Sequence, residues 1–134
     1  MPPFYELSVA SFKQQSSPKS RWAFAVVFSS SSGHSLLYQI EGSSSHHSMD
    51  VPQSVTLKAG ENGYVGKIPV GVVDAENLHQ LHSALTTVRI ENGNPAWSSH
   101  DWVMGGIAEL RRREIYHIEK HVTAHWVSER LGEK

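Results

Sequence analysis

Short hydrophobic runs alternate with polar stretches in the first part of the chain, which is the pattern of a β-sheet protein. Hydrophobic residues fall at every second position of residues 4–10, as in a strand with one buried face. Residues 22–28 are hydrophobic throughout and rich in aromatic and β-branched side chains, which indicates a central strand covered on both faces. The polar stretch between them, residues 11–20, is predicted to be a loop.

The same alternation predicts three further strands, over residues 35–41, 54–58 and 64–73. A serine-rich turn at residues 29–33 makes the first of these a hairpin partner of the central strand. Pro69 has no backbone N–H to donate, so the last strand is expected to lie at an edge or to bend there. Residues 43–52, which include His46 and His47, are predicted to be a polar loop.

Helical spacing replaces this alternation in the second half of the chain. Asp74 is predicted to cap a short helix with leucines at every third or fourth position. Residues 87–91 are expected to be briefly extended. A final helix is predicted over residues 114–131, with a hydrophobic stripe along one side.

Between these two helices, residues 97–113 are predicted to form the helix around which the domain is organised. Ser98 and Asp101 make a Ser-x-x-Asp capping box, and the helix dipole favours the carboxylate in the first turn. Four hydrophobic residues then recur at helical spacing, which predicts one buried face: Trp102, Val103, Ile107 and Leu110. The first turn of this helix therefore presents a hydroxyl, an imidazole and a carboxylate outward.

Composition and element order together predict one α+β domain, residues 1–134. Strands come first and helices later, so we expect an antiparallel sheet of about five strands with helices packed on it. The formal net charge of −1 argues against a nucleic-acid or acidic-membrane partner. The chain has no cysteine, which excludes a thiol nucleophile and thiolate metal ligands. No targeting segment or membrane span is predicted, so a cytoplasmic location is expected.

Two short motifs open the central strand and the organising helix. They are Arg-Trp-Ala at residues 21–23 and Ser-Ser-His-Asp-Trp-Val at residues 98–103. In kind and in order they resemble the circularly permuted papain-like (NlpC-type) family, which includes the lecithin:retinol acyltransferase-like proteins. There, a His-Trp-Ala element and an Asn-Cys-x-x-aromatic-Val element stand in these places. The resemblance covers residues 4–110, is strongest to small fungal proteins of this fold, and implies a site where the helix start meets the strand start.

Both catalytic positions of that family are changed in this chain. Arg21 stands where the family has its histidine base, and Ser99 stands where it has its cysteine. Arginine stays protonated at any workable pH and cannot take a proton from serine, so the parent chemistry is not expected here. His34 and Gln39 are candidates for the family's third polar position. His100 is a candidate acid or base near neutral pH, or a residue that simply faces solvent.

The replaced pair is instead expected to bind an anion. A helix N-terminus offers unpaired N–H groups, and Arg21 would add a fixed positive charge opposite them. The residues expected to line this site and bind a small, partly apolar acid are Arg21, Trp22, Tyr38, Trp97, Ser98 and Asp101. Capping alone is an equally good explanation for the serines and Asp101.

Three functions are left open by the sequence. The first is a thiol-free, repurposed domain that handles a small molecule, as a cofactor-independent cyclase or isomerase in small-molecule biosynthesis. The second is a catalytically inactive binding module, and the third is a Ser99-based hydrolase or acyltransferase with His34 or His100 as base. No cofactor or metal is expected, although His117, His121 and His125 have His-x-x-x-His spacing along one helical stripe.

Overall fold

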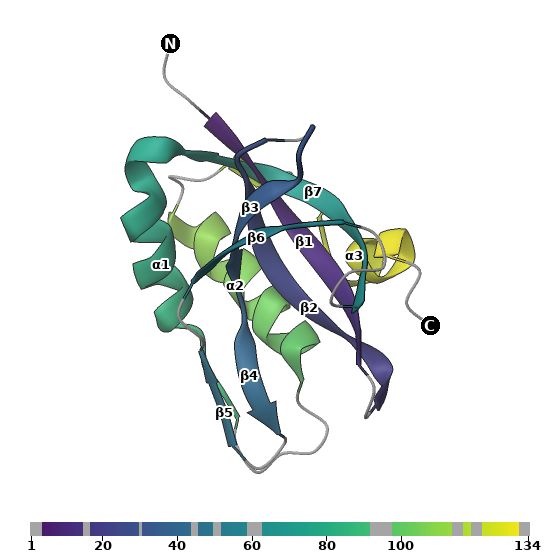
Figure 1. Cartoon of the computed structure of the whole chain (residues 1–134). Coiled ribbons are helices and arrows are strands. Elements are labelled where there is room, and N and C mark those ends of the chain that lie inside the picture. Colours follow the sequence, from purple (N-terminus) through teal and green to yellow (C-terminus); the bar gives the residue numbers. More distant parts are fainter. Residues whose placement is uncertain are drawn as a thin grey trace.

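An antiparallel sheet, strongly curled, forms the centre of the domain (Figure 1). The computed structural model describes residues 4–14, 17–29, 31–43, 46–49, 52–58, 63–91, 98–113, 117–118 and 122–131. The three longest strands are β1 (Phe4–Gln14), β2 (Ser17–Val27) and β7 (Tyr64–Asp74). The shorter strands are β3 (His34–Tyr38), β6 (Gln53–Thr56) and β8 (His117–Ile118).

Strand order in this sheet is β6-β3-β2-β1-β7-β8, and each neighbouring pair is antiparallel. Since β8 contributes two residues at the edge, the sheet consists of five main strands. The predicted α+β class with an antiparallel sheet of about five strands is confirmed. Pro69 lies beside a register shift in the pairing of β7 with β1, so the expected bend at this proline is confirmed as well.

Three predicted boundaries in the strand region are wrong. β1 continues to Gln14 and β2 starts at Ser17, so residues 11–20 are mostly paired strand and not a loop. The single strand predicted over residues 35–41 is interrupted at Gln39. β4 (Ile40–Ser43) then pairs with β5 (His46–Met49) in a separate hairpin, and β5 lies inside the loop predicted over residues 43–52. Backbone pairing between polar segments explains these differences, because it leaves no hydrophobic pattern in the sequence.

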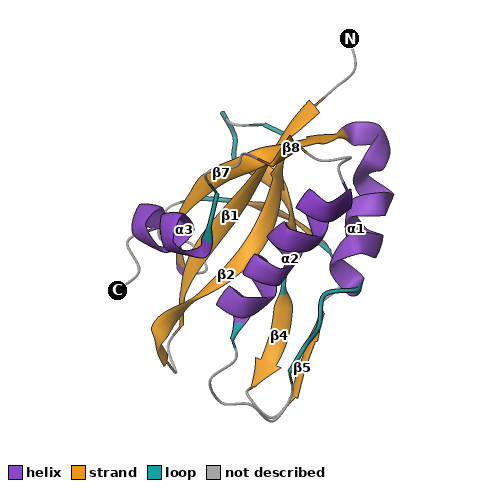
Figure 2. Ribbon diagram, turned by 180° about the vertical axis from the view of Figure 1, so that it is seen from behind, coloured by secondary structure: helices purple, strands orange, loops and turns teal. Residues whose placement is uncertain are grey.

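The helices pack on the sheet as three separate segments. A 3₁₀ turn (Ala75–Asn77) follows β7, and the Asp74 carboxylate accepts a hydrogen bond from the Glu76 N–H at 2.9 Å, which confirms the predicted cap. α1 (Leu78–Thr86) and α2 (Ser99–Arg113) lie side by side on one face of the sheet, and α3 (Ala124–Leu131) lies near β7 (Figure 2). Residues 87–91 form no strand, contrary to expectation.

The single helix predicted over residues 114–131 is also wrong. His117 and Ile118 form β8, and α3 begins after Thr123. The Thr123 hydroxyl accepts a hydrogen bond from the Trp126 N–H at 3.2 Å, so this threonine caps the helix. Arg111 of α2 donates to the Val122 carbonyl at 2.9 Å and fixes the segment just before the cap. The sequence pattern does not distinguish a threonine cap between two short elements from one continuous helix.

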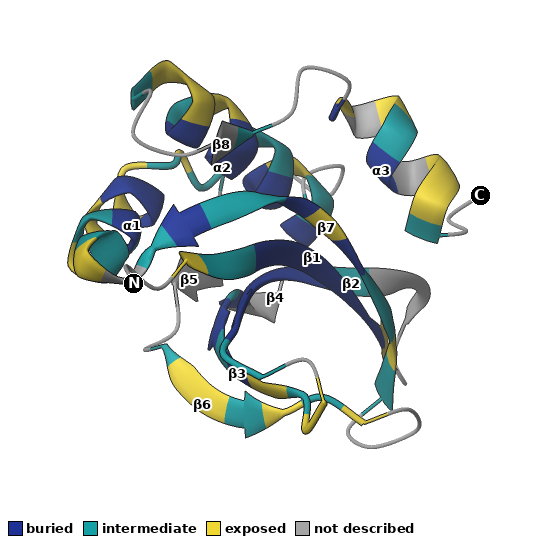
Figure 3. Cartoon of the chain, turned by 90° about the horizontal axis from the view of Figure 1, so that it is seen from above, coloured by how far each residue is buried: buried dark blue, intermediate teal, exposed yellow. Residues whose placement is uncertain are grey.

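Hydrophobic side chains form two clusters, one on each face of the curled sheet. Figure 3 shows the curl of the sheet, with buried residues along much of β1 and β2. The larger cluster lies between the sheet and the helices and includes the large side chains of Trp22, Phe24 and Trp102. The smaller cluster lies inside the curl. Its buried members are Ala10, Phe12, Ala23, Ala25 and Leu37. Small side chains on the inner face leave room for the sheet to curl.

Gly106 lets α2 approach β2 closely. A Cβ atom built at this position would lie 2.6 Å from Cε2 of Phe24 and 3.1 Å from Cδ2 of Leu85. Both side chains are fully buried and have little room to shift. Because the helix sits this low on the sheet, its first turn reaches the start of the hydrophobic part of β2.

Candidate functional site

The start of α2 meets β2 through one buried hydrogen bond. The Trp22 backbone N–H donates to Oγ of Ser99 at 3.0 Å, across 77 residues of sequence. The predicted contact between these two segments is therefore confirmed. It also means that the Ser99 oxygen already accepts a hydrogen bond from the main chain of the strand, so Ser99 helps to hold α2 on β2.

The capping box at the start of α2 is confirmed in detail. The Ser98 N–H donates to Oδ2 of Asp101 at 2.8 Å, and the Ser98 hydroxyl accepts from the His100 N–H at 3.2 Å. The Ser98 carbonyl accepts from the N–H groups of Asp101 and Trp102 at 3.0 and 3.2 Å. Three N–H groups of the first turn are thus satisfied within the helix, and an anion would have to displace these bonds to use them.

His100 lies flat on the indole of Trp22. The two ring centroids are 3.8 Å apart and the planes meet at 16°. Neighbouring helix positions point about 100° apart, so the imidazole of His100 is directed away from the hydroxyl of Ser99. In the part of the chain that the structure describes, no imidazole or carboxylate hydrogen-bonds to Ser99.

Arg21 is brought close to α2 by its backbone but not by its side chain. Its guanidinium carbon lies 4.8 Å from the centre of the Phe12 ring, in the cluster inside the curl. Trp22, the next residue, points to the helices. Successive strand residues point to opposite faces, so the Arg21 charge and the Ser99 hydroxyl are separated by the sheet. The predicted pairing of Arg21 with the helix N-terminus is corrected accordingly.

His34 lies at the other end of the sheet from Ser99. Its carbonyl accepts from the Phe28 N–H at 2.9 Å, six residues along from Trp22, which corresponds to about 20 Å of extended strand. Its Nε2 is 2.8 Å from Oγ of Ser54. The expectation that His34 serves as a base for Ser99 is therefore corrected, because register on the sheet sets the two residues far apart.

Gln39 and Tyr38 lie where β3 ends. Oε1 of Gln39 is buried and has no hydrogen-bond partner among the described residues. Tyr38 is 2% exposed and belongs to the helix-facing cluster, and burial raises the pKa of its hydroxyl above the ordinary value. Its ring centroid is 6.2 Å from that of His82. Tyr38 is thus a core residue, with its ring directed between sheet and helices.

Other predicted residues are dispersed or undescribed. Trp97 and His121 lie outside the described residues, as do the side chains of His46, His47 and His117. His125 is on α3, where its Nε2 is 3.1 Å from the Glu129 carboxylate. His117 belongs to β8 and His125 to α3, so these two residues do not share one helical stripe. Among the residues that can be assessed, no group of three or more potential ligands could hold a metal ion.

A surface pocket of about 360 Å³, which the sequence does not indicate, lies between α2 and the segment that follows α1. It is lined by Thr87, Val88, Arg89, Glu91, Asp101, Gly105 and Glu109. One residue in each turn of α2 contributes to it, at positions 101, 105 and 109. This four-residue spacing is visible in the sequence, but the facing segment that follows α1 is not predictable from it.

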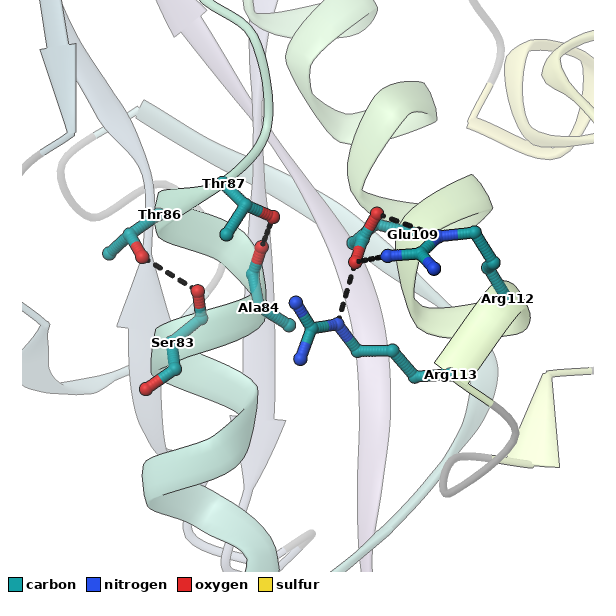
Figure 4. Close-up of polar contacts among 7 residues, drawn as sticks. All are labelled: Ser83, Ala84, Thr86, Thr87, Glu109, Arg112 and Arg113. Carbon is teal, nitrogen blue, oxygen red and sulfur yellow. Dashed lines mark hydrogen bonds and ion pairs between the residues drawn. The ribbon is translucent and has the colours of Figure 1, made fainter.

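Glu109 is held between two arginines at the end of α2 (Figure 4). Arg112 and Arg113 each donate to its carboxylate at 2.6 Å. The hydrogen bonds from Arg112 and Arg113 lower the pKa of Glu109 below its ordinary value. Thr87 also uses its hydroxyl proton locally, in a 2.6 Å hydrogen bond to the Ala84 carbonyl.

Within the described ranges, none of the helices combines the length and hydrophobicity needed to cross a bilayer. Comparison with protein families, with curated proteins and with solved structures gives no match to this chain. Function therefore has to be argued from the geometry of the chain itself.

Proposed function

We propose that this chain is a thiol-free, repurposed domain of the permuted papain-like type that binds a small molecule without covalent catalysis. The observation that carries the proposal is the hydrogen bond from the Trp22 N–H to Oγ of Ser99. A nucleophilic serine needs a base that removes its proton. Here the main chain of β2 lies against the serine oxygen instead, and Ser99 holds the helix on the sheet.

The dispersal of the other polar candidates supports a binding role over acid–base chemistry. Arg21 contacts Phe12 on the inner face of the sheet, and His34 contacts Ser54 near its far end. His100 is stacked on Trp22. General acid–base catalysis requires two groups within hydrogen-bond reach of one substrate, which these three residues do not offer together. The cyclase or isomerase alternative therefore lacks a supporting geometry.

Labelling with a fluorophosphonate tests the proposal against a serine hydrolase. We expect no adduct on the wild-type protein by intact-mass spectrometry, because Ser99 is buried and no imidazole or carboxylate of the described residues hydrogen-bonds to it. The Ser99→Ala variant is the control for labelling elsewhere. Stoichiometric modification that disappears in Ser99→Ala would establish the hydrolase or acyltransferase alternative and refute the proposal.

The Ser99→Cys variant tests the same point with a better nucleophile. A cysteine at the exposed Ser31 provides the comparison for an ordinary surface thiol. We expect Ser99→Cys to be alkylated more slowly than Ser31→Cys, since Ser99 is 8% exposed. Faster alkylation of Ser99→Cys would show that this helix start still activates a nucleophile.

A further inference from the structure

The pocket beside α2 contains opposite charges that do not neutralise each other. Arg89 makes no ion pair or hydrogen bond with any other residue that the structure describes. Asp101, on the same pocket wall as Gly105, lies too far from Arg89 for an ion pair. Arg89 and Asp101 thus line the same pocket without forming an ion pair with each other.

Asp101 keeps part of its hydrogen-bonding capacity. Its Oδ2 accepts from the Ser98 N–H, while Oδ1 has no such partner in the described part of the chain. Glu109 differs, because Arg112 and Arg113 already occupy its carboxylate (Figure 4). The charges available to a ligand are therefore the Arg89 guanidinium and the Asp101 carboxylate.

The rest of the lining admits a small polar molecule. Gly105 lets α2 approach Val88 closely, since a Cβ built there would lie 3.0 Å from Cγ1 of Val88 and narrow the pocket. The Thr87 hydroxyl donates to Ala84, which leaves its oxygen able to accept a hydrogen bond. A volume of about 360 Å³ falls at the small end of the range for small-molecule sites.

We propose that this pocket binds a small zwitterion of the α-amino-acid type, with its carboxylate on Arg89 and its ammonium group on Asp101. A guanidinium binds a carboxylate through two parallel hydrogen bonds, and a carboxylate accepts strongly from an ammonium group. A ligand with a single charge would pair with only one of the two side chains, Arg89 or Asp101. This inference deepens the proposed function and rests on it, since it names the ligand class of a binding domain.

Calorimetric titration of the full chain with three related compounds tests the ligand class. Leucine carries both charges, N-acetyl-leucine lacks the ammonium group, and leucinamide lacks the carboxylate. We expect leucine to bind, and each blocked compound to bind about ten- to a hundredfold more weakly, because each loses one charge-assisted contact. Equal affinity for all three compounds, or no binding of any of them, would overturn the inference.

Single substitutions test the assigned residues. We expect Arg89→Gln and Asp101→Asn each to weaken leucine binding by about tenfold or more. Asparagine retains a side-chain oxygen for the Ser98 N–H, so the cap is preserved. Arg130→Gln and Glu129→Gln remove one arginine charge and one carboxylate charge on α3 and should bind leucine like the wild type. Wild-type affinity in Arg89→Gln would also overturn the inference.

A third variant tests the shape of the pocket. Gly105→Ala should reduce leucine binding, whereas Gly66→Ala, where a Cβ meets nothing within 4 Å, should leave binding unchanged. Thermal unfolding of each variant checks that the domain is intact. The two proposals fail separately, because labelling of Ser99 refutes the non-catalytic role, while the titrations bear on the pocket alone.

Discussion

Alternate residues of β2 face two different environments. Trp22, Phe24 and Val26 point to the helices and are fully buried among large side chains. Ala23 and Ala25 point into the curl, where Ala10 pairs directly with Ala23. The first face has the volume to hold two helices, and the second has the small side chains that a curled sheet needs on its inside.

The two faces of β2 explain why Arg21 and Ser99 do not form one site. Arg21 and Trp22 are neighbours in the sequence, but only Trp22 lies on the face of β2 that meets Ser99 and His100. A charge placed at Arg21 therefore acts inside the curl, beside Phe12. On the helix side, Trp22 supplies a backbone donor and an aromatic surface, which stabilise the joint between α2 and β2.

The largest expected effects come from removing one aromatic ring from each of the two clusters, Phe24 on the helix side and Phe12 inside the curl. Phe24→Ala should lower the free energy of unfolding by about 3–5 kcal/mol, because Trp102 and Gly106 of α2 cannot move in to fill the space. Phe12→Ala should cost less, about 3 kcal/mol or below, since the partly exposed side chains of Tyr64 and Arg21 can shift inward. Urea unfolding measures both, and a larger loss for Phe12→Ala would contradict the comparison.

Ser99→Ala tests the hydrogen bond that links α2 to β2. We expect a loss of about 1–3 kcal/mol, because the buried Trp22 N–H is left without an acceptor. Ser98→Ala is the matched control on the neighbouring residue, where loss of the helix cap should cost about 1 kcal/mol. Urea midpoints at neutral pH give both values. A smaller stability loss in Ser99→Ala than in Ser98→Ala would show that the Trp22–Ser99 hydrogen bond contributes less to stability than the Ser98 cap.

The smallest expected effect concerns an ion pair next to the inner cluster. Burial raises the pKa of Glu6, but hydrogen bonds from Lys67 and Ser8 and the charge of Lys67 together lower it below the model-peptide value of 4.5. The lowered pKa stabilises the fold above pH 4.5, and this stabilisation is lost as pH falls through the folded-state pKa. Because Glu6 is 35% exposed, the contribution should stay below about 1 kcal/mol.

Unfolding measured between about pH 5 and pH 3 checks this ion pair. The Glu6→Gln variant should lose less stability than the wild type over this interval. Glu129→Gln, on the exposed surface of α3, should follow the wild type. If wild type and Glu6→Gln lose stability in parallel, the Lys67 contact at 2.6 Å contributes nothing to folding.

Local patterns predicted much of the fold. A continuous hydrophobic run predicted β2, and the alternation of hydrophobic and polar residues predicted β7. The Ser98–Asp101 capping box predicted the start of α2 within one residue. These features depend on neighbouring residues, whose side chains and backbone interact within one turn or one strand. The α+β class followed from the order of strands and helices along the chain.

Long-range pairing was not predictable in the same way. β5 and β8 exist because a partner strand satisfies their backbone groups, and nothing in their composition records that partner. The division of residues 114–131 into β8 and α3 likewise depends on the edge of β7 and on the Thr123 cap. Gly106 gave no signal of its own, since only the packed helix shows what its missing Cβ would meet.

The sequence by itself determined that residues 22–27 lie in a central strand, because a continuous run of aromatic and β-branched residues favours a strand buried on both faces. It also determined that Ser98 caps a helix. Only the tertiary structure decided which face meets that helix, and hence that Ser99 bonds to Trp22 while Arg21 contacts Phe12. It also brought Arg89 and Asp101 to one pocket. The physical reason is that burial and pairing between distant segments depend on the whole packed chain, whereas caps and alternation depend on a few adjacent residues.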